Sequence, residues 1–182
     1  MSATILSSKT VHRGRVFTVV TETVTLENGV TAELDLVRHP GASAVVAVSE
    51  EKEVKLLYQY RHALGRRIWE IPAGTLEVEE APLACAQREL AEEAGVRAER
   101  WEKIGELVPV PGYSDERIAL FMAAGLAPAP QHLDRDELLE VFDVPFEKAM
   151  EMIDTGEISD AKTVSALLLA ERARKRNRPN TG

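Results

Sequence analysis

Four glutamates and one arginine between Gly74 and Gly95 stand at a spacing that could bind a metal ion. Three of the acids, Glu89, Glu92 and Glu93, occupy positions i, i+3 and i+4, so on a helix they share one face. Like charges at this spacing destabilise an isolated helix by roughly 0.2–0.5 kcal/mol per pair. A hard divalent cation such as Mg²⁺ or Mn²⁺ would offset that repulsion, because both prefer oxygen ligands. The alternative is a solvated acidic helix face with no ligand.

The complete pattern extends well beyond these three acids. It consists of Gly74, Glu80, Arg88-Glu89-Leu90, Glu92-Glu93 and Gly95-Val96, at fixed separations. Every position matches the signature of the Nudix hydrolases, which the chain therefore resembles. Members of that superfamily cleave nucleoside diphosphates linked to another group. The resemblance implies an α+β fold, an α/β/α sandwich in which helices flank a mixed central β-sheet.

The residues around the acids predict a helix over 81–94. Pro82 suits the first helical position, and Gly95 suits the C-terminal stop. Leu83, Leu90 and Ala94 recur at helical spacing on a face away from the glutamates, and we expect all three to pack on the core. Before the helix, residues 71–74 read as the exit from a strand into a loop. There Gly74 is expected to adopt a backbone angle that other residues avoid.

The resemblance implies the metal ligands. Glu89 and Glu93 are expected to be the principal ligands of two or three Mg²⁺ or Mn²⁺ ions, with Glu92 sharing one of them. The backbone carbonyl of Ala73, directly before the motif glycine, is a further ligand in the family. Glu80 and Arg88 are expected to brace the loop and orient these ligands.

Other segments resemble one subfamily, the ADP-ribose pyrophosphatases. The similar segments are 58–74, the loop after Pro111, and residues 134–141. By position, Arg61 is expected to bind a substrate phosphate and Glu70 to lie near the adenine or the metal approach. The terminal ribose is expected beside Gly112, Ser114 and Glu116.

Arg61 and Glu70 could each have a purely structural role instead. Arg61 could be an ordinary surface arginine, and Glu70 could form a salt bridge with Arg66 or Arg67. Trp69, beside Glu70, is expected to pack rather than to stack on a base.

The subfamily places its catalytic glutamate on a loop before the last strand. Of two acidic positions there, the first is Arg135 in this chain, a departure from the pattern, and the second is Glu137. Glu137 is the predicted base, with Asp136 and Glu93 as rivals. Glu92 and Glu93 are expected to contribute to catalysis through the metal.

The expected activity is the hydrolysis of ADP-ribose to AMP and ribose 5-phosphate. One alternative is a Nudix hydrolase of GDP-mannose or a UDP-sugar. Another is a non-catalytic ADP-ribose sensor, but such a module usually lacks some carboxylates of the signature or carries a DNA-binding domain, and neither feature is seen here.

Bulk properties limit the other function classes. The 182 residues carry a formal net charge of −8, which disfavours nucleic acid as a partner. Residues 171–182 are locally basic, with five Lys and Arg residues against Glu171, and read as a solvated helix end. No window has the roughly 18 apolar residues of a membrane helix, and the N-terminus lacks a signal-peptide core. With the single cysteine, Cys85, these features predict a cytoplasmic protein that does not act at a membrane.

The remaining elements follow from hydrophobic alternation and turn signals. Strands are predicted at 16–26 and 30–36 around Asn28-Gly29, and as a second pair at 43–49 and 54–60. Further strands are expected at 104–110, 118–124 and 139–144, with an acidic loop at 125–138. Helices are expected at 146–153 and 161–174, the second capped by Asp160.

We divide the chain into an N-terminal β-hairpin subdomain, residues 1–40, and a catalytic domain, residues 41–182. An isolated hairpin is barely stable, so residues 1–40 must pack on something. A homodimer is the simplest solution. The resembled subfamily shares its active sites between two subunits.

Overall fold

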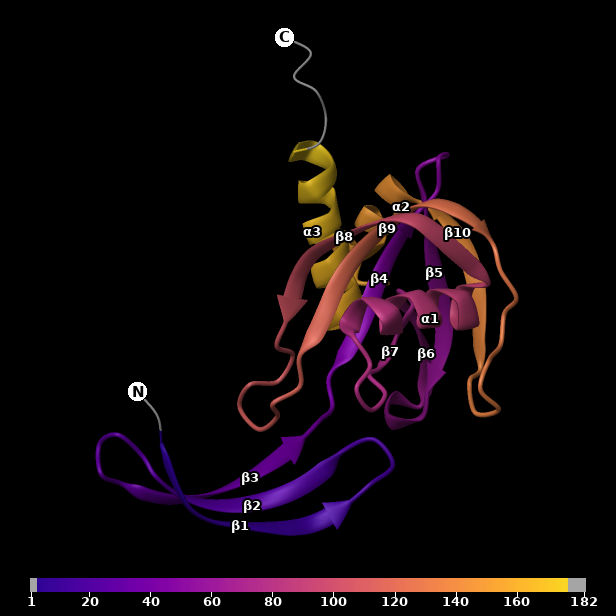
Figure 1. The fold of residues 1–182 in the computed structure, drawn as a ribbon. Helices are drawn as coiled ribbons and strands as arrows, with labels where there is room; N and C mark the ends of the chain where they lie inside the picture. Colours follow the sequence, from indigo (N-terminus) through magenta and orange to yellow (C-terminus); the bar gives the residue numbers. More distant parts are fainter. Residues whose placement is uncertain (1–2, 177–182) are drawn as a thin grey trace. The chain divides into compact units, whose positions relative to one another are not determined.

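The computed structural model describes residues 3–176 (Figure 1). Its elements form two compact units. The first unit comprises the chain up to Gly41 together with Val108–Arg117, and the second comprises Ala42–Leu107 and the chain from Ile118 onward. The far end of the basic C-terminal segment, including Arg178, lies outside the described residues.

The first unit is a three-stranded antiparallel sheet in the order β1-β2-β3. Its strands are β1 (Thr4–Arg13), β2 (Thr18–Thr25) and β3 (Thr31–Arg38). β2 and β3 form the predicted hairpin, turning where Gly29 has a φ of 80°. β1 was not predicted from the sequence, and it pairs with β2 through two irregularities in register. The segment after Pro111 joins this unit, since Val37 donates its N–H to the Tyr113 carbonyl at 2.7 Å.

The second unit contains a seven-stranded mixed sheet. Five strands lie in the order β10-β5-β4-β9-β8, while β6 pairs with β5 and β7 pairs with β4. Only the β4–β9 pair is parallel among the strand pairs described for this unit. The strands are β4 (Ala42–Val48), β5 (Glu53–Arg61), β6 (Arg66–Glu70), β7 (Ala73–Thr75), β8 (Val96–Leu107), β9 (Ile118–Pro128) and β10 (Leu139–Pro145).

Helices cover both faces of this sheet. They are α1 (Pro82–Ala94), α2 (Phe146–Asp154) and α3 (Ala161–Arg176), with a short 3₁₀ turn, η1 (His62–Leu64), between β5 and β6. Along β4, Ala44 and Val46 pack with α2 and α3, whereas Val45 and Ala47 pack with α1. Alternate residues of one strand therefore face opposite layers, which is the predicted α/β/α sandwich (Figure 1).

Three expectations about element boundaries and packing are wrong. β8 begins at Val96 rather than near Ile104, and β9 continues to Pro128 before the acidic loop begins. Leu83 does not pack on the core: it is 40% exposed, whereas Leu90 and Ala94 are buried as predicted.

None of the helices in residues 3–176 is long and apolar enough to cross a lipid bilayer.

Candidate active site

Helix α1 carries the predicted metal-binding glutamates on a side that is largely enclosed. Gly95 ends the helix with a φ of 64°, and its N–H reaches back to the Ala91 carbonyl at 3.1 Å. Glu89 and Glu93 are both buried, while the Glu92 side chain is 40% exposed. Two carboxylates in the interior are unusual unless a partner compensates them, so this side of α1 is the natural place for a cationic ligand.

Glu93 contacts the backbone just before the motif glycine. Ala73 donates its N–H to Glu93 Oε2 at 2.7 Å. Burial raises the pKa of the Glu93 carboxyl to about 8. The Ala73 hydrogen bond and the charge of Arg61 act against this rise, and the charges of Glu89 and Glu137 add to it. A proton or a cation is therefore needed at this carboxyl near neutral pH.

The strand pairing fixes the direction of the Ala73 backbone. Val45 donates to the Pro72 carbonyl at 2.9 Å, and Ala44 lies opposite Ala73. This register makes Ala44–Ala73 a non-hydrogen-bonded pair, so the N–H and C=O of Ala73 both point away from β4. The carbonyl thus faces the same side as the N–H that binds Glu93.

Glu89 lies against Gly74. A Cβ added to Gly74 would overlap the Glu89 carboxylate. Gly74 lies within β7 and is not among the glycines with positive φ, so the predicted reason for this glycine is wrong. Burial also raises the pKa of Glu89, and the adjacent Arg88 guanidinium opposes that shift.

Arg88 connects the helix to the loop that precedes it. Its Nε and Nη2 each donate to the Glu80 carboxylate at 2.9 Å, and Nη2 also donates to the Thr75 carbonyl at 3.2 Å. Nη1 donates to Glu89 at 2.5 Å and to Glu92 at 3.1 Å. The two hydrogen bonds from Arg88 lower the pKa of Glu80 to about 2. Glu80 is thus held as an anion that anchors the loop to α1.

Arg61 and Glu70 form an ion pair. Arg61 Nε donates to Glu70 Oε2 at 2.8 Å, and the Glu70 side chain is only 3% exposed. The second carboxylate oxygen, Oε1, accepts a hydrogen bond from Lys162 Nζ at 2.6 Å. The expected alternative partners of Glu70 are therefore wrong, since Arg67 instead pairs with Glu140 at 3.1 Å.

Sequence reasoning missed two residues near this pair. Lys162 lies 92 positions after Glu70, and no local pattern connects them. Gln59 stands two residues before Arg61 on the same face of β5, and it is buried with its amide oxygen unpartnered among the described residues. Trp69 packs as expected, with its ring 4.8 Å from Tyr58 and 5.1 Å from Phe142.

The predicted loop base lies within electrostatic range of the helix acids. The charge of Glu137 raises the pKa of both Glu89 and Glu93. In the structure its Oε2 accepts the Asp134 N–H at 2.9 Å, which folds the loop into a turn. The fold therefore brings Glu137 close to Glu89 and Glu93.

The predicted ribose contacts belong to the first structural unit. Ser114 forms a bridge with Val37, and its Oγ accepts the Glu116 N–H at 3.1 Å. A carboxylate oxygen of Glu116 lies 3.9 Å from Nδ1 of His39. Gly112 is in the same segment. Their role toward a substrate stays a prediction.

The donor chemistry of α1 fits a divalent cation. Glu89, Glu92 and Glu93 supply hard oxygen donors on one side of the helix, and burial disfavours the uncompensated charge of Glu89 and Glu93. Within residues 3–176, no three such side chains are grouped tightly enough to form a complete metal cage. Arg88 donates hydrogen bonds to one oxygen of Glu89 and to one of Glu92.

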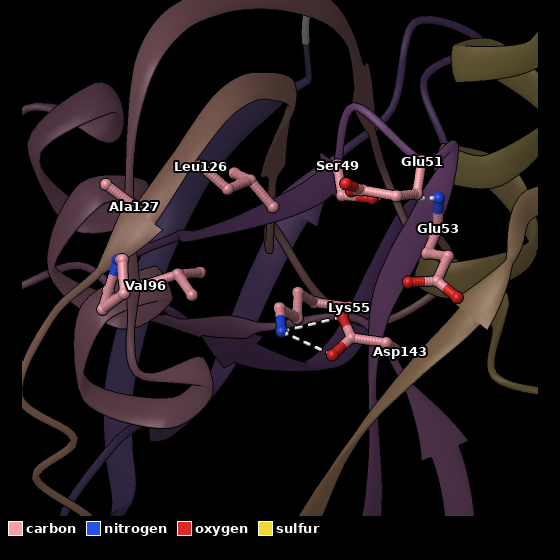
Figure 2. Close-up of a pocket in the computed structure, with 9 residues that line it drawn as sticks. Ser49, Glu51, Glu53, Lys55, Val96, Leu126, Ala127 and Asp143 are labelled. Atoms are coloured by element: carbon pink, nitrogen blue, oxygen red, sulfur yellow. Dashed lines mark hydrogen bonds and ion pairs between the residues drawn. The ribbon is translucent and has the colours of Figure 1, made fainter.

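A separate cavity of about 220 Å³ lies away from these residues. Figure 2 shows its lining, in which Lys55 and Asp143 form an ion pair at 2.7 Å. Ser49, Glu51, Val96 and Leu126 also line it. Because the cavity is open and contains none of the predicted site residues, we do not assign the chemistry to it.

Comparison with known proteins identifies relatives over most of the chain. It is 38% identical over 164 residues to an ADP-ribose pyrophosphatase of Bacillus subtilis, covering 89% of both chains. It is equally similar, over the same share, to a methanol dehydrogenase activator of Bacillus methanolicus. An ADP-ribose pyrophosphatase of Mycobacterium tuberculosis is 35% identical, covering 90% of this chain and 80% of the relative.

A solved structure and a family model agree with these relatives. The crystal structure of an ADP compounds hydrolase superposes with a TM-score of 0.84 and 26% identity, covering 98% of each chain. The model of the NUDIX domain matches residues 37–180, a range that includes the entire glutamate motif. The chain therefore belongs to the NUDIX domain family and is a Nudix hydrolase.

Proposed function

We propose that this Nudix hydrolase is an ADP-ribose pyrophosphatase that converts ADP-ribose and water to AMP and ribose 5-phosphate. The observation that carries the proposal is the enclosure of Glu89 and Glu93 against Ala73 and Gly74. These buried carboxylates would supply the cation site that hydrolysis of a pyrophosphate requires. Two relatives that carry the name ADP-ribose pyrophosphatase support the choice of substrate.

Nudix hydrolases require divalent metal ions, and in this chain we assign them to α1. Glu89 and Glu93, with Glu92 and the carbonyl of Ala73, would hold two or three Mg²⁺ or Mn²⁺ ions. Bound there, the ions would neutralise phosphate charge and make water more acidic. Arg88 and Glu80 keep the loop and the ligands in place, since Arg88 contacts Glu80, Glu89 and Glu92 together.

The remaining side chains act on the substrate. The Arg61 guanidinium would bind a phosphate oxygen, and Glu70 orients it through the 2.8 Å hydrogen bond. Glu137 would accept the proton of the attacking water, with Asp136 and Glu93 as the other candidates. The water oxygen bonds to one phosphorus and the bridging P–O bond breaks, so the two products are monophosphates. Gly112, Ser114 and Glu116 are assigned to the terminal ribose.

A substrate panel tests this proposal. ADP-ribose, GDP-mannose and a UDP-sugar are incubated with Mg²⁺ or Mn²⁺, and with EDTA as the control, and the products are separated by chromatography. We expect AMP and ribose 5-phosphate from ADP-ribose and no turnover with EDTA. A kcat/KM about tenfold higher for GDP-mannose or a UDP-sugar would overturn the substrate. Binding of ADP-ribose without turnover would indicate a sensor instead.

We also propose a homodimer formed through the first unit. β1 exposes Ile5, Leu6 and Val11, each by more than half. Large apolar side chains that stay exposed together on one strand are typical of a surface that binds another protein. A second copy of the chain would cover these side chains by twofold symmetry. Each active site would then include residues of both subunits.

A further inference from the structure

Four side chains of alternating charge are linked in series behind Arg61. Asp160 accepts a hydrogen bond from Lys162 at 3.0 Å, Lys162 donates to Glu70 at 2.6 Å, and Arg61 donates to Glu70 at 2.8 Å. The series joins the beginning of α3 to the ends of β5 and β6. Neither Asp160 nor Lys162 belongs to the glutamate motif.

The two cations divide the Glu70 carboxylate between them. Lys162 takes Oε1 and Arg61 takes Oε2, so both oxygens of a buried side chain are occupied. Arg61 uses its Nε alone for this contact. The guanidinium is therefore held at its Nε. Neither terminal nitrogen makes a hydrogen bond within residues 3–176. The Arg61 side chain is 41% exposed, so these nitrogens are available to an anion.

Lys162 is held firmly in this position. Asp160 accepts a hydrogen bond from the Thr163 N–H at 3.0 Å and another from the Thr163 hydroxyl at 2.6 Å, which caps α3. The Thr163 hydroxyl in turn accepts the N–H of Ile71 at 3.0 Å. One end of α3 therefore fixes the side chain of Glu70 and the backbone of the next residue.

Removal of Lys162 would change how Glu70 binds Arg61. An arginine and a carboxylate prefer to form two parallel hydrogen bonds, and a buried carboxylate oxygen without a partner is costly. With Oε1 vacated, Glu70 would therefore bind Nε and a terminal nitrogen of Arg61 together. That arrangement removes a donor from the substrate, and the loss of the lysine also removes a positive charge behind Arg61.

We propose that Lys162 is a positioning residue: by occupying Glu70 Oε1, it keeps the terminal nitrogens of Arg61 free to bind substrate phosphate. The inference rests on the proposed function, in which Arg61 contacts phosphate. It assigns the segment 160–163, at the start of the last helix, to substrate binding. It also explains why a lysine with only 14% of its side chain exposed lies between two acids.

A mutant cycle tests the inference. We compare kcat and KM of the wild type with Lys162→Met, Lys162→Arg, Glu70→Gln and the double variant Lys162→Met/Glu70→Gln. The matched control is Lys148→Met, which removes an exposed lysine that pairs with Glu151 at 3.1 Å. The substrate is whichever member of the panel the wild type hydrolyses fastest, so failure of ADP-ribose as substrate leaves this test intact.

We expect Lys162→Met to raise KM about tenfold, the lower end of the range for losing a hydrogen bond to a charged group, with kcat changed far less. Lys162→Arg retains a cationic donor and should stay near the wild type. Adding Glu70→Gln to Lys162→Met should lower KM again, because a neutral amide cannot hold Arg61 as strongly. Lys148→Met should leave both constants unchanged.

A second readout is independent of turnover. Calorimetry in EDTA, with that same panel substrate as the probe, should give a ratio of Kd values for Lys162→Met and wild type that equals the ratio of their KM values. If Lys162→Met does not fold, as judged by circular dichroism, Lys162→Gln replaces it under the same criteria. A KM within twofold of wild type would refute the proposal. So would a loss confined to kcat, or a double variant with a KM no lower than that of Lys162→Met.

Discussion

Gly74 and Glu89 lie so close together that no side chain fits between the Gly74 backbone and the Glu89 carboxylate. Gly74 is part of β7, where it pairs with Ser43 of β4, so its backbone cannot move aside without loss of sheet pairing. Glu89 is buried on α1 at the same point. The glycine of the motif is thus required by the close approach of a strand and a glutamate.

Gly74→Ala should consequently displace the Glu89 carboxylate. We expect kcat/KM to fall about a hundredfold or more, since misplaced active-site groups can cost this much. The unfolding free energy should fall by about 1–3 kcal/mol, as for other overpacked sites. Gly112→Ala is the control for stability alone, because a Cβ there meets no atom within 4 Å. Equal effects of the two substitutions on stability would contradict the steric explanation.

Glu93→Gln tests the metal-ligand role. The variant keeps the shape of the side chain, and its amide oxygen can still accept the Ala73 N–H. We expect kcat to fall by more than the roughly 10–100-fold typical of residues that merely support a ligand. The metal-free variant should remain folded and be at least as stable as the wild type. Near-wild-type turnover at saturating Mg²⁺ would remove Glu93 from the ligand set.

The raised pKa of Glu93 predicts a pH dependence of stability. Because the folded protein holds this proton more tightly than the unfolded chain, its contribution is fully present below pH 4.5 and is lost as the pH rises through about 8. Urea unfolding in EDTA should therefore show lower stability at about pH 9 than at about pH 6. Glu93→Gln should flatten this change. An unchanged slope in the variant would assign the effect to another group.

The sequence predicted the elements whose signals are local. Asn28-Gly29 marked the β2–β3 turn, and Asp160 marked the start of α3. β1 has no regular alternation and exists through its pairing with β2, so it gave no signal. The first half of β8 is rich in exposed charged residues, which concealed the strand.

In the candidate site too, the residues set by local spacing were predicted and those set by the tertiary fold were not. Fixed spacing along one helix brought Glu89, Glu92 and Glu93 together, and the motif alone predicted them. Glu70 and Lys162 meet because α3 packs near the end of β6, which depends on the tertiary fold. Leu83 was misjudged because helical periodicity places it on the apolar side, whereas residues 82–84 at the start of α1 are exposed and burial begins at Cys85 and Ala86.

Gln59 offers a test of stability alone. Its amide oxygen is buried without a hydrogen bond partner in the described part of the chain. Gln59→Met keeps the volume and removes that oxygen, so we expect the unfolding free energy to rise by about 1 kcal/mol. Gln131→Met is the matched control, because the Gln131 amide donates to the Glu93 carbonyl at 2.6 Å and its loss should destabilise. Equal losses in both variants, measured by urea unfolding, would argue against an unsatisfied group.

Exposed apolar side chains on β1 of the first unit predict assembly into a dimer. Leu6 and Val11 both lie at the points where the β1–β2 register shifts, and they are 59% and 61% exposed. If a second copy covers them, Leu6→Lys/Val11→Lys should place charges in the interface and yield a monomer at micromolar concentration. Residues away from regular pairing tolerate substitution, so the sheet itself should persist by circular dichroism.

Deletion of residues 1–40 is a harsher form of the same test. It should abolish dimerisation and ADP-ribose turnover together, but it also strips Tyr113 and Asp115 of their hydrogen bonds to β3. The double lysine variant leaves those contacts in place, so a loss of turnover there reports on the partner subunit alone. Sedimentation velocity and kcat/KM are measured on the same sample. A wild-type chain that sediments as a fully active monomer would show that each active site is complete within one subunit.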